Sequence, residues 1–127
     1  MEEQLLISDL AKLSGVKPGM IRYFEKLGLI TPSIRTPSGY RVFSPHHVKE
    51  LQFVRKMYDL GFYAQHIKKL RGIKSSDLSI EEKKEAIKEA FEDHAEYIKE
   101  RIKHFQGLYE RVEEAALTFV DEVLKDC

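Results

Sequence analysis

Apolar residues recur at helical spacing along most of the chain, and turn residues interrupt them. Leu10 and Leu13 follow Ser8, which predicts a short helix with Ser8 as its N-cap. A glycine then ends this helix, and Pro18 suits the first position of a second helix that runs to about Leu27. Two helices joined by so short a turn predict a helix-turn-helix.

The second predicted helix has two unlike faces. Ile21, Phe24 and Leu27 form an apolar stripe that is expected in the core. The opposite face offers side chains that can donate hydrogen bonds to phosphates or base edges. An ordinary solvated face is the alternative interpretation. The residues of this face are Gly19, Arg22, Tyr23 and Lys26.

The stretch "SIRTPSGYRVFS", residues 33–44, predicts a β-hairpin, because two short segments of strand formers flank a turn with proline and glycine. Arg35 lies on one arm, and Tyr40 and Arg41 lie on the other. A basic hairpin directly after such a helix is typical of a wing that contacts DNA beside it. A hairpin that only covers the core is the alternative.

Two further helices are expected before a polar linker. Ser44, as an N-cap followed by proline, starts a third helix that reaches about Leu60. A short fourth helix carries Ile67 and Leu70 on one face, and residues 71–79 are expected to form the linker.

The last predicted helix is far longer than a small domain can cover. Ser79 and Glu82 form a capping box at its start, and no proline interrupts it before about Lys125, a length of about 70 Å. With Phe91 as an a position of a heptad, every later a position is apolar, so a second copy is the simplest partner. Gly107 either permits close approach of that partner or marks a break. The predicted dimerisation residues are Phe91, Ile98, Phe105, Leu108, Val112 and Phe119.

Charge divides the chain into two parts. Residues 1–73 carry 12 Lys+Arg against 6 Asp+Glu, a net charge of +6, whereas residues 74–127 carry 9 against 15, a net charge of −6. We therefore expect one domain over residues 1–73 that faces a polyanion, and a linker with the long helix over residues 74–127.

Composition excludes several classes of protein. The start of the chain does not resemble a signal peptide, and no apolar stretch approaches the ~20 residues that span a bilayer. Cys127 is the only cysteine, so no internal disulfide can form and a cytoplasmic location is expected. No catalytic constellation or phosphate-binding glycine loop is present, so we expect no enzyme.

These motifs together resemble the MerR family of transcription regulators. The resemblance covers residues 5–73 closely, through "ISDLAKLSGVKPGMIRYFEKLGLITPSIRTPSGYRVFS" and "LGFYAQHIKKL". It implies a mainly α fold: a winged helix-turn-helix with a small β-hairpin wing, followed by a long antiparallel coiled-coil dimerisation helix. It also implies a homodimer that binds a palindromic promoter operator, bends and untwists the spacer DNA, and thereby lets RNA polymerase contact both promoter elements.

The resemblance assigns DNA-contacting roles to particular residues. Three departures from the family's usual pattern stand beside them: Phe24 replaces a second tyrosine, Tyr58 stands where a basic residue is common, and Tyr63 stands where a small residue is commoner. The first two suggest weaker anchoring to phosphate. The predicted DNA-binding residues are Lys17, Arg22, Tyr23, Lys26, Arg35, Tyr40 and Arg41.

The sequence does not identify an effector. Paired cysteines for metal sensing are absent, and His46 and His47 are adjacent at a helix start, where both cannot easily face one site. No metal or cofactor is therefore expected. A small-molecule effector, if there is one, would bind between the coiled-coil helix and the DNA-binding domain, near Phe91, Tyr97, Phe105 and Tyr109.

A second class of function also fits part of the pattern. A protein-interaction adaptor similar to a chaperone modulator could keep a MerR-like winged helix and bind another protein without any role at DNA. The outward basic face of residues 18–27 and the net charge of +6 argue against this interpretation.

Overall fold

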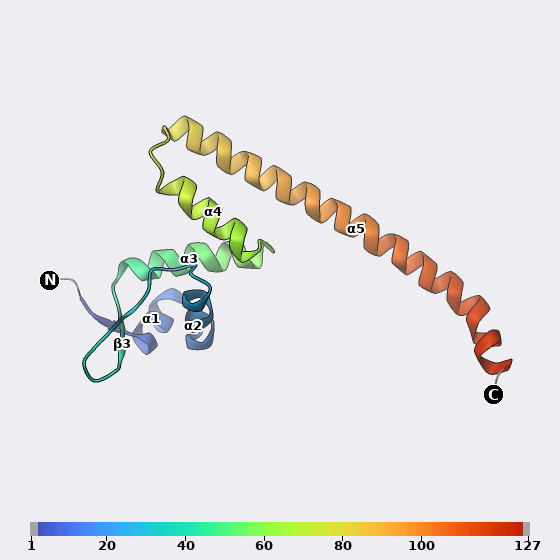
Figure 1. Ribbon diagram of the computed structural model, residues 1–127, viewed down its shortest axis with the longest axis horizontal. Coiled ribbons are helices and arrows are strands. Elements are labelled where there is room, and N and C mark those ends of the chain that lie inside the picture. The colour runs from blue at the N-terminus through green and yellow to red at the C-terminus, as the bar shows by residue number, and fades with distance from the viewer. Residues whose placement is uncertain (1–2, 126–127) are drawn as a thin grey trace. The chain divides into compact units, whose positions relative to one another are not determined.

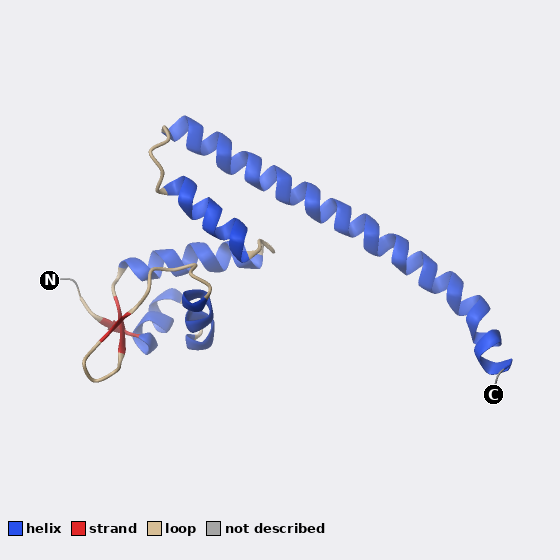
Figure 2. Cartoon of the chain, viewed as in Figure 1, coloured by secondary structure: helices blue, strands red, loops and turns tan. Residues whose placement is uncertain are grey.

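The computed structural model describes residues 3–125 and divides into two compact units, Met1–Ser79 and Ile80–Cys127 (Figure 1). We call the first unit the head. It contains four helices, α1 (Ile7–Ser14), α2 (Pro18–Lys26), α3 (His46–Asp59) and α4 (Ala64–Lys74), and three short strands. The second unit is a single helix, α5 (Ile80–Lys125). The predicted mainly α class is confirmed (Figure 2).

Three strands, β1 (Leu5–Leu6), β2 (Ile34–Arg35) and β3 (Arg41–Phe43), form an antiparallel sheet in the order β1-β3-β2. Strands β2 and β3 are the arms of the predicted hairpin, with Arg35 opposite Arg41. Gly39 has a φ of 89° in the turn between them, a conformation that favours glycine. The sequence analysis missed β1, which pairs Leu5 with Phe43 and so ties the hairpin to the start of α1.

Several helix boundaries differ from the prediction. Helix α1 begins before Ser8, and Asp9 rather than Ser8 accepts the N–H of Leu6, at 3.1 Å. Helix α3 begins at His46, and no side chain caps its N-terminus. Ser44 is therefore not the N-cap, contrary to the prediction. The predicted linker starts too early, because α4 continues through residues 71–74.

The core of the head lies where the helices and the sheet meet. The predicted core residues Ile21 and Phe24 of α2 are fully buried, whereas Leu13 is 58% exposed, contrary to the helical stripe predicted for it. Residues from all four helices complete the core: those that are fully buried include Leu10, Leu51, Val54 and Ile67. No helix between residues 3 and 125 combines the length and apolar character needed to cross a membrane.

Candidate nucleic-acid interface

Helix α2 buries one face and exposes the other, as its pattern predicts. Because Ile21 and Phe24 hold it against the core, Arg22, Tyr23 and Lys26 are left exposed. Lys17 is also exposed, directly before the helix. The exposed face therefore carries two ammonium groups, a guanidinium and a phenol, all of which donate hydrogen bonds.

A hollow of about 280 Å³ lies between this face and the hairpin. Arg22 contributes from α2, and Arg35 and Arg41 contribute from β2 and β3. Tyr40, which is 65% exposed, lies at the hairpin end of the hollow. The structure thus brings three arginines that are separated in sequence to the lining of one hollow, where guanidinium groups can bind an anion.

One hydrogen bond and one ion pair hold the arginines of the hairpin. The Arg35 guanidinium donates to the carbonyl oxygen of Gly39 at 3.0 Å. Arg41 Nε lies 3.4 Å from Glu25 Oε1, and the Glu25 carboxylate also accepts the N–H of Ser33. Burial raises the pKa of Glu25, but the bonds from Ser33 and the charge of Arg41 outweigh it, so the pKa lies below its ordinary value. Glu25 therefore stays ionised and fixes the hairpin to α2, a role that the sequence analysis missed.

A second carboxylate fixes the segment that joins α2 to β2. Glu50 of α3 accepts the N–H of Thr31 at 2.9 Å, the Thr31 hydroxyl at 3.1 Å and an Arg71 N–H at 3.2 Å. Arg71 also donates to the carbonyl of Leu29. Burial raises the pKa of Glu50, but the bonds from Thr31 and the charge of Arg71 lower it below the ordinary value. The position of the hairpin relative to α2 thus depends on α3 and α4.

The first part of the chain, residues 5–72, matches the family model for the MerR helix-turn-helix regulatory proteins. The chain belongs to the MerR family. It is 47% identical over 64 residues to the transcriptional regulator HmrR of Sinorhizobium medicae, an alignment that covers 50% of this chain and 44% of HmrR. The chain therefore spans about half the length of the curated relatives it matches.

Solved MerR-family structures share this fold. PbrR691 of Ralstonia metallidurans, crystallised with lead(II), superimposes with a TM-score of 0.72 at 18% identity and covers 87% of this chain and 84% of its own. HiNmlR, bound to promoter DNA, superimposes with a TM-score of 0.57 at 21% identity, covering 85% of this chain and 80% of its own. At these identities the likeness concerns the fold alone.

The departures from the MerR pattern have structural explanations. Phe24 is fully buried, and its ring packs at 5.5 Å from the ring of Tyr58. A ring with no exposed surface cannot place a hydroxyl on phosphate, so the loss expected from Phe24 does not follow from its position. Tyr58 and Tyr63 are both exposed.

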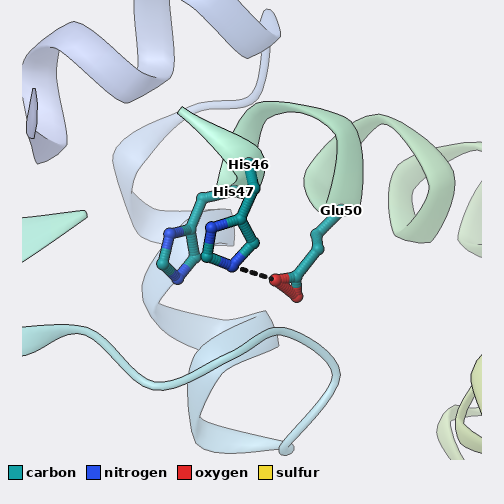
Figure 3. Close-up of side chains that lie close together, drawn as sticks. All are labelled: His46, His47 and Glu50. Atoms are coloured by element: carbon teal, nitrogen blue, oxygen red, sulfur yellow. Dashed lines mark ion pairs between the residues drawn. The ribbon is translucent and has the colours of Figure 1, made fainter. Parts of the chain in front are cut away.

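One histidine cluster lies at the start of α3 (Figure 3). Ligand atoms of His46, His47 and Glu50 lie within 4.8 Å of one another, so the expectation that the two histidines cannot share a site is wrong. However, His47 Nδ1 accepts the N–H of Ser44 at 3.0 Å, and Nε2 donates to the carbonyl of Thr31 at 2.8 Å. A metal ion bound by His47 would have to displace one of these bonds, whereas His46 Nε2 lies 3.3 Å from Glu50 Oε1 in an ion pair (Figure 3).

Helix α5 carries an apolar stripe that can also be described in a second heptad frame. With Phe91 at d instead of a, nine further a and d positions follow, and all ten residues are apolar and exposed. Leu108 is half-buried and lies at the flank of this stripe. The d positions are Phe91, Ile98, Phe105, Val112 and Phe119, and the a positions are Ala95, Ile102, Tyr109, Ala116 and Val123.

Proposed function

We propose that this MerR-family chain binds double-stranded promoter DNA as a homodimer and regulates transcription from that promoter. The observation that carries the proposal is the hollow in which Arg22, Arg35 and Arg41 surround one space beside the exposed face of α2. Guanidinium groups bind phosphate with paired hydrogen bonds, and a helix of this kind fits the major groove. The DNA-bound relative HiNmlR supports this use of the fold.

The exposed residues divide into two roles. Arg22 and Tyr23 lie on α2, where they would reach base edges in the major groove, with Lys17 and Lys26 on the flanking phosphates. The hairpin residues Arg35, Tyr40 and Arg41 would contact the backbone beside that groove. Glu25 and Glu50 would not contact DNA, but they set the distance between the two groups of contacts.

The homodimer would form through the stripe on α5. If two antiparallel helices centre on Gly107, every a position meets a d position of the other copy, with Phe105 against Tyr109 on both sides of the centre. The flanking positions then set Lys99 near Glu113 of the other copy, an attractive pair that a parallel, in-register arrangement lacks. The remaining layers pair Phe91 with Val123, Ala95 with Phe119, Ile98 with Ala116, and Ile102 with Val112.

Two-fold symmetry determines the form of the target. A symmetric dimer presents two identical heads, so its operator is an inverted repeat. Following the MerR resemblance, the operator would lie in a promoter spacer that the bound dimer bends and untwists, so that RNA polymerase can contact both promoter elements. Deformation of DNA costs energy that phosphate contacts by the basic head would offset.

The decisive experiment measures duplex binding by the full chain and by Arg22→Ala and Arg41→Ala. A duplex enriched from a random-sequence pool serves as the ligand, and Lys103→Ala on α5 serves as the control. We expect each arginine variant to weaken binding by at least about 1 kcal/mol and the control to bind like the unmodified protein. Unchanged affinity in both arginine variants, with folding verified by circular dichroism, would refute the DNA-binding proposal. A stoichiometric protein partner without duplex binding would support the adaptor instead.

A further inference from the structure

A second hollow, of about 710 Å³, opens in the head and shares no lining residue with the one beside the hairpin. It lies between the end of α2, the first half of α3 and the second half of α4. Its walls include four cationic side chains and one carboxylate, together with the half-buried ring of Phe53. The cationic residues are Lys49, Lys68, Arg71 and Lys74.

Two of the four cationic side chains of this hollow, Lys49 and Lys68, are not neutralised by an ion pair within the described residues. Glu50, its one carboxylate, already accepts bonds from Thr31 and Arg71. Lys49 and Lys68 form no ion pair with any residue between 3 and 125. Arg71 has five N–H donors, and its bonds to Leu29 and Glu50 leave others available. The hollow is therefore a concave surface with spare donors and an excess of positive charge.

Gly72 is one of the residues that line this hollow. A glycine inside a helix costs about 1 kcal/mol relative to alanine, and α4 carries Gly72 in its last turns. Its φ is not positive, and a Cβ built there meets no atom within 4 Å. Neither backbone conformation nor packing thus requires glycine at this position. A side chain would, however, project beside the cationic residues, so the glycine has a clear consequence for the space inside the hollow.

We propose that this hollow binds a small phosphorylated molecule. Arg71 would bind phosphate oxygens with its spare N–H groups, and Lys49 and Lys68 would supply the remaining charge. The ring of Phe53 offers an apolar wall for the organic part of the ligand. Because Arg71 and Glu50 hold the segment between α2 and β2, a ligand here would also act on the position of the hairpin. That regulatory consequence rests on the proposed DNA binding, whereas ligand binding itself does not.

Titration calorimetry with inorganic pyrophosphate at low ionic strength tests the binding. We expect one saturable site per chain, a loss of affinity of about tenfold or more in Lys68→Glu, and a change within about twofold in Lys69→Glu. Lys69 neighbours Lys68 on α4 and is exposed, but it does not line the hollow. Both variants alter the net charge equally, so a difference between them reports on the hollow. Equal losses in the two variants would reveal only general attraction and would overturn the site.

A second variant fills the space without changing charge. Gly72→Leu is expected to keep or raise the melting temperature, since leucine favours helix, and to abolish saturable pyrophosphate binding. Normal binding by a folded Gly72→Leu protein would overturn the proposal. The phosphate could also belong to the DNA backbone: in that case the unmodified protein would show no saturable pyrophosphate binding, and Lys68→Glu would weaken duplex binding more than Lys69→Glu. That result would also reject the small-molecule site.

Discussion

The head buries its apolar side chains, whereas α5 exposes them. In the head, 15 hydrophobic residues are buried among four helices and a three-stranded sheet. In α5, no described residue is buried. Even the large side chains of its apolar stripe are accessible: Phe105 is 58% exposed and Tyr109 is 60% exposed. The head therefore buries its apolar surface within one chain. The apolar stripe of α5 can be removed from water only when another surface covers it.

This difference separates two kinds of stability in one molecule. Changes inside the head should alter its unfolding without altering association of the chains. Changes on the stripe of α5 should alter association and leave the head folded. The basic surface and the apolar stripe can for the same reason be tested one at a time.

The largest effect is expected from Phe105→Glu, at the centre of the proposed helix pair. Two carboxylates would be buried among apolar residues in each dimer, at a cost of at least about 3 kcal/mol. Analytical ultracentrifugation should then show a monomer at concentrations where the unmodified protein is a dimer, while near-ultraviolet circular dichroism shows that the head remains folded. Lys103→Glu adds a carboxylate on the outer side of the same helix turn and should remain dimeric. A dimeric Phe105→Glu protein would exclude the stripe as the interface.

Phe24→Ala tests whether the head can be destabilised without affecting association of the chains. Phe24 is fully buried and packs against Tyr58, so its truncation leaves a cavity and should lower the free energy of unfolding of the head by about 3–5 kcal/mol. Urea unfolding monitored by tyrosine fluorescence measures the loss. Sedimentation of the same variant below its unfolding midpoint should still show a dimer. Dissociation in parallel with head unfolding would mean that the two units are not independent.

How much of the fold and of the candidate site the sequence predicts depends on how far apart in sequence the interacting residues lie. Proline and glycine positions around α2 identified the helix-turn-helix and the hairpin, because those signals are local. Strand β1 has only two residues, too few for a periodic pattern. The N-cap of α1 is Leu6 rather than Ser8, because the strand precedes the helix directly and Asp9 accepts the N–H of Leu6. Each of Arg22, Arg35 and Arg41 was identified from the sequence. That they line one hollow could not be predicted, because they lie on different elements.

The role of Glu50 was not predictable for the same reason. Its partners Thr31 and Arg71 lie 19 and 21 residues away, on either side of it, and no spacing rule connects them. The two apolar series of α5, from Phe91 and from Ala95, could be read from the sequence because a heptad repeat is a local pattern. Both series are exposed in the structure and therefore accessible to a second helix.

Glu50→Gln should give an intermediate effect that depends on pH. The pKa of Glu50 in the folded head is lower than its ordinary value of 4.5, so the ionised carboxylate stabilises the head above that pH. The stabilisation is lost as pH falls through the lowered pKa. At pH 7 we expect Glu50→Gln to cost about 1–3 kcal/mol, and near pH 3 the difference should shrink. Urea unfolding at both pH values measures it, with Glu100→Gln on the outer side of α5 as the control. A constant difference at both pH values would contradict this role of the carboxylate.

The smallest effect is expected from Gly107→Ala, which tests whether this glycine permits close approach of a second helix. Helix α5 is continuous through Gly107, and an added Cβ meets no atom within 4 Å, so the break is not present. In the frame with Phe91 at d, Gly107 lies on the outer side of the pair. Alanine should therefore raise the stability of each helix by about 1 kcal/mol, which thermal unfolding at a fixed protein concentration measures, and leave the dimer intact. If Gly107 instead allowed close approach of the second helix, the added methyl group would weaken association, and the centre of the pair would have to be rebuilt around it.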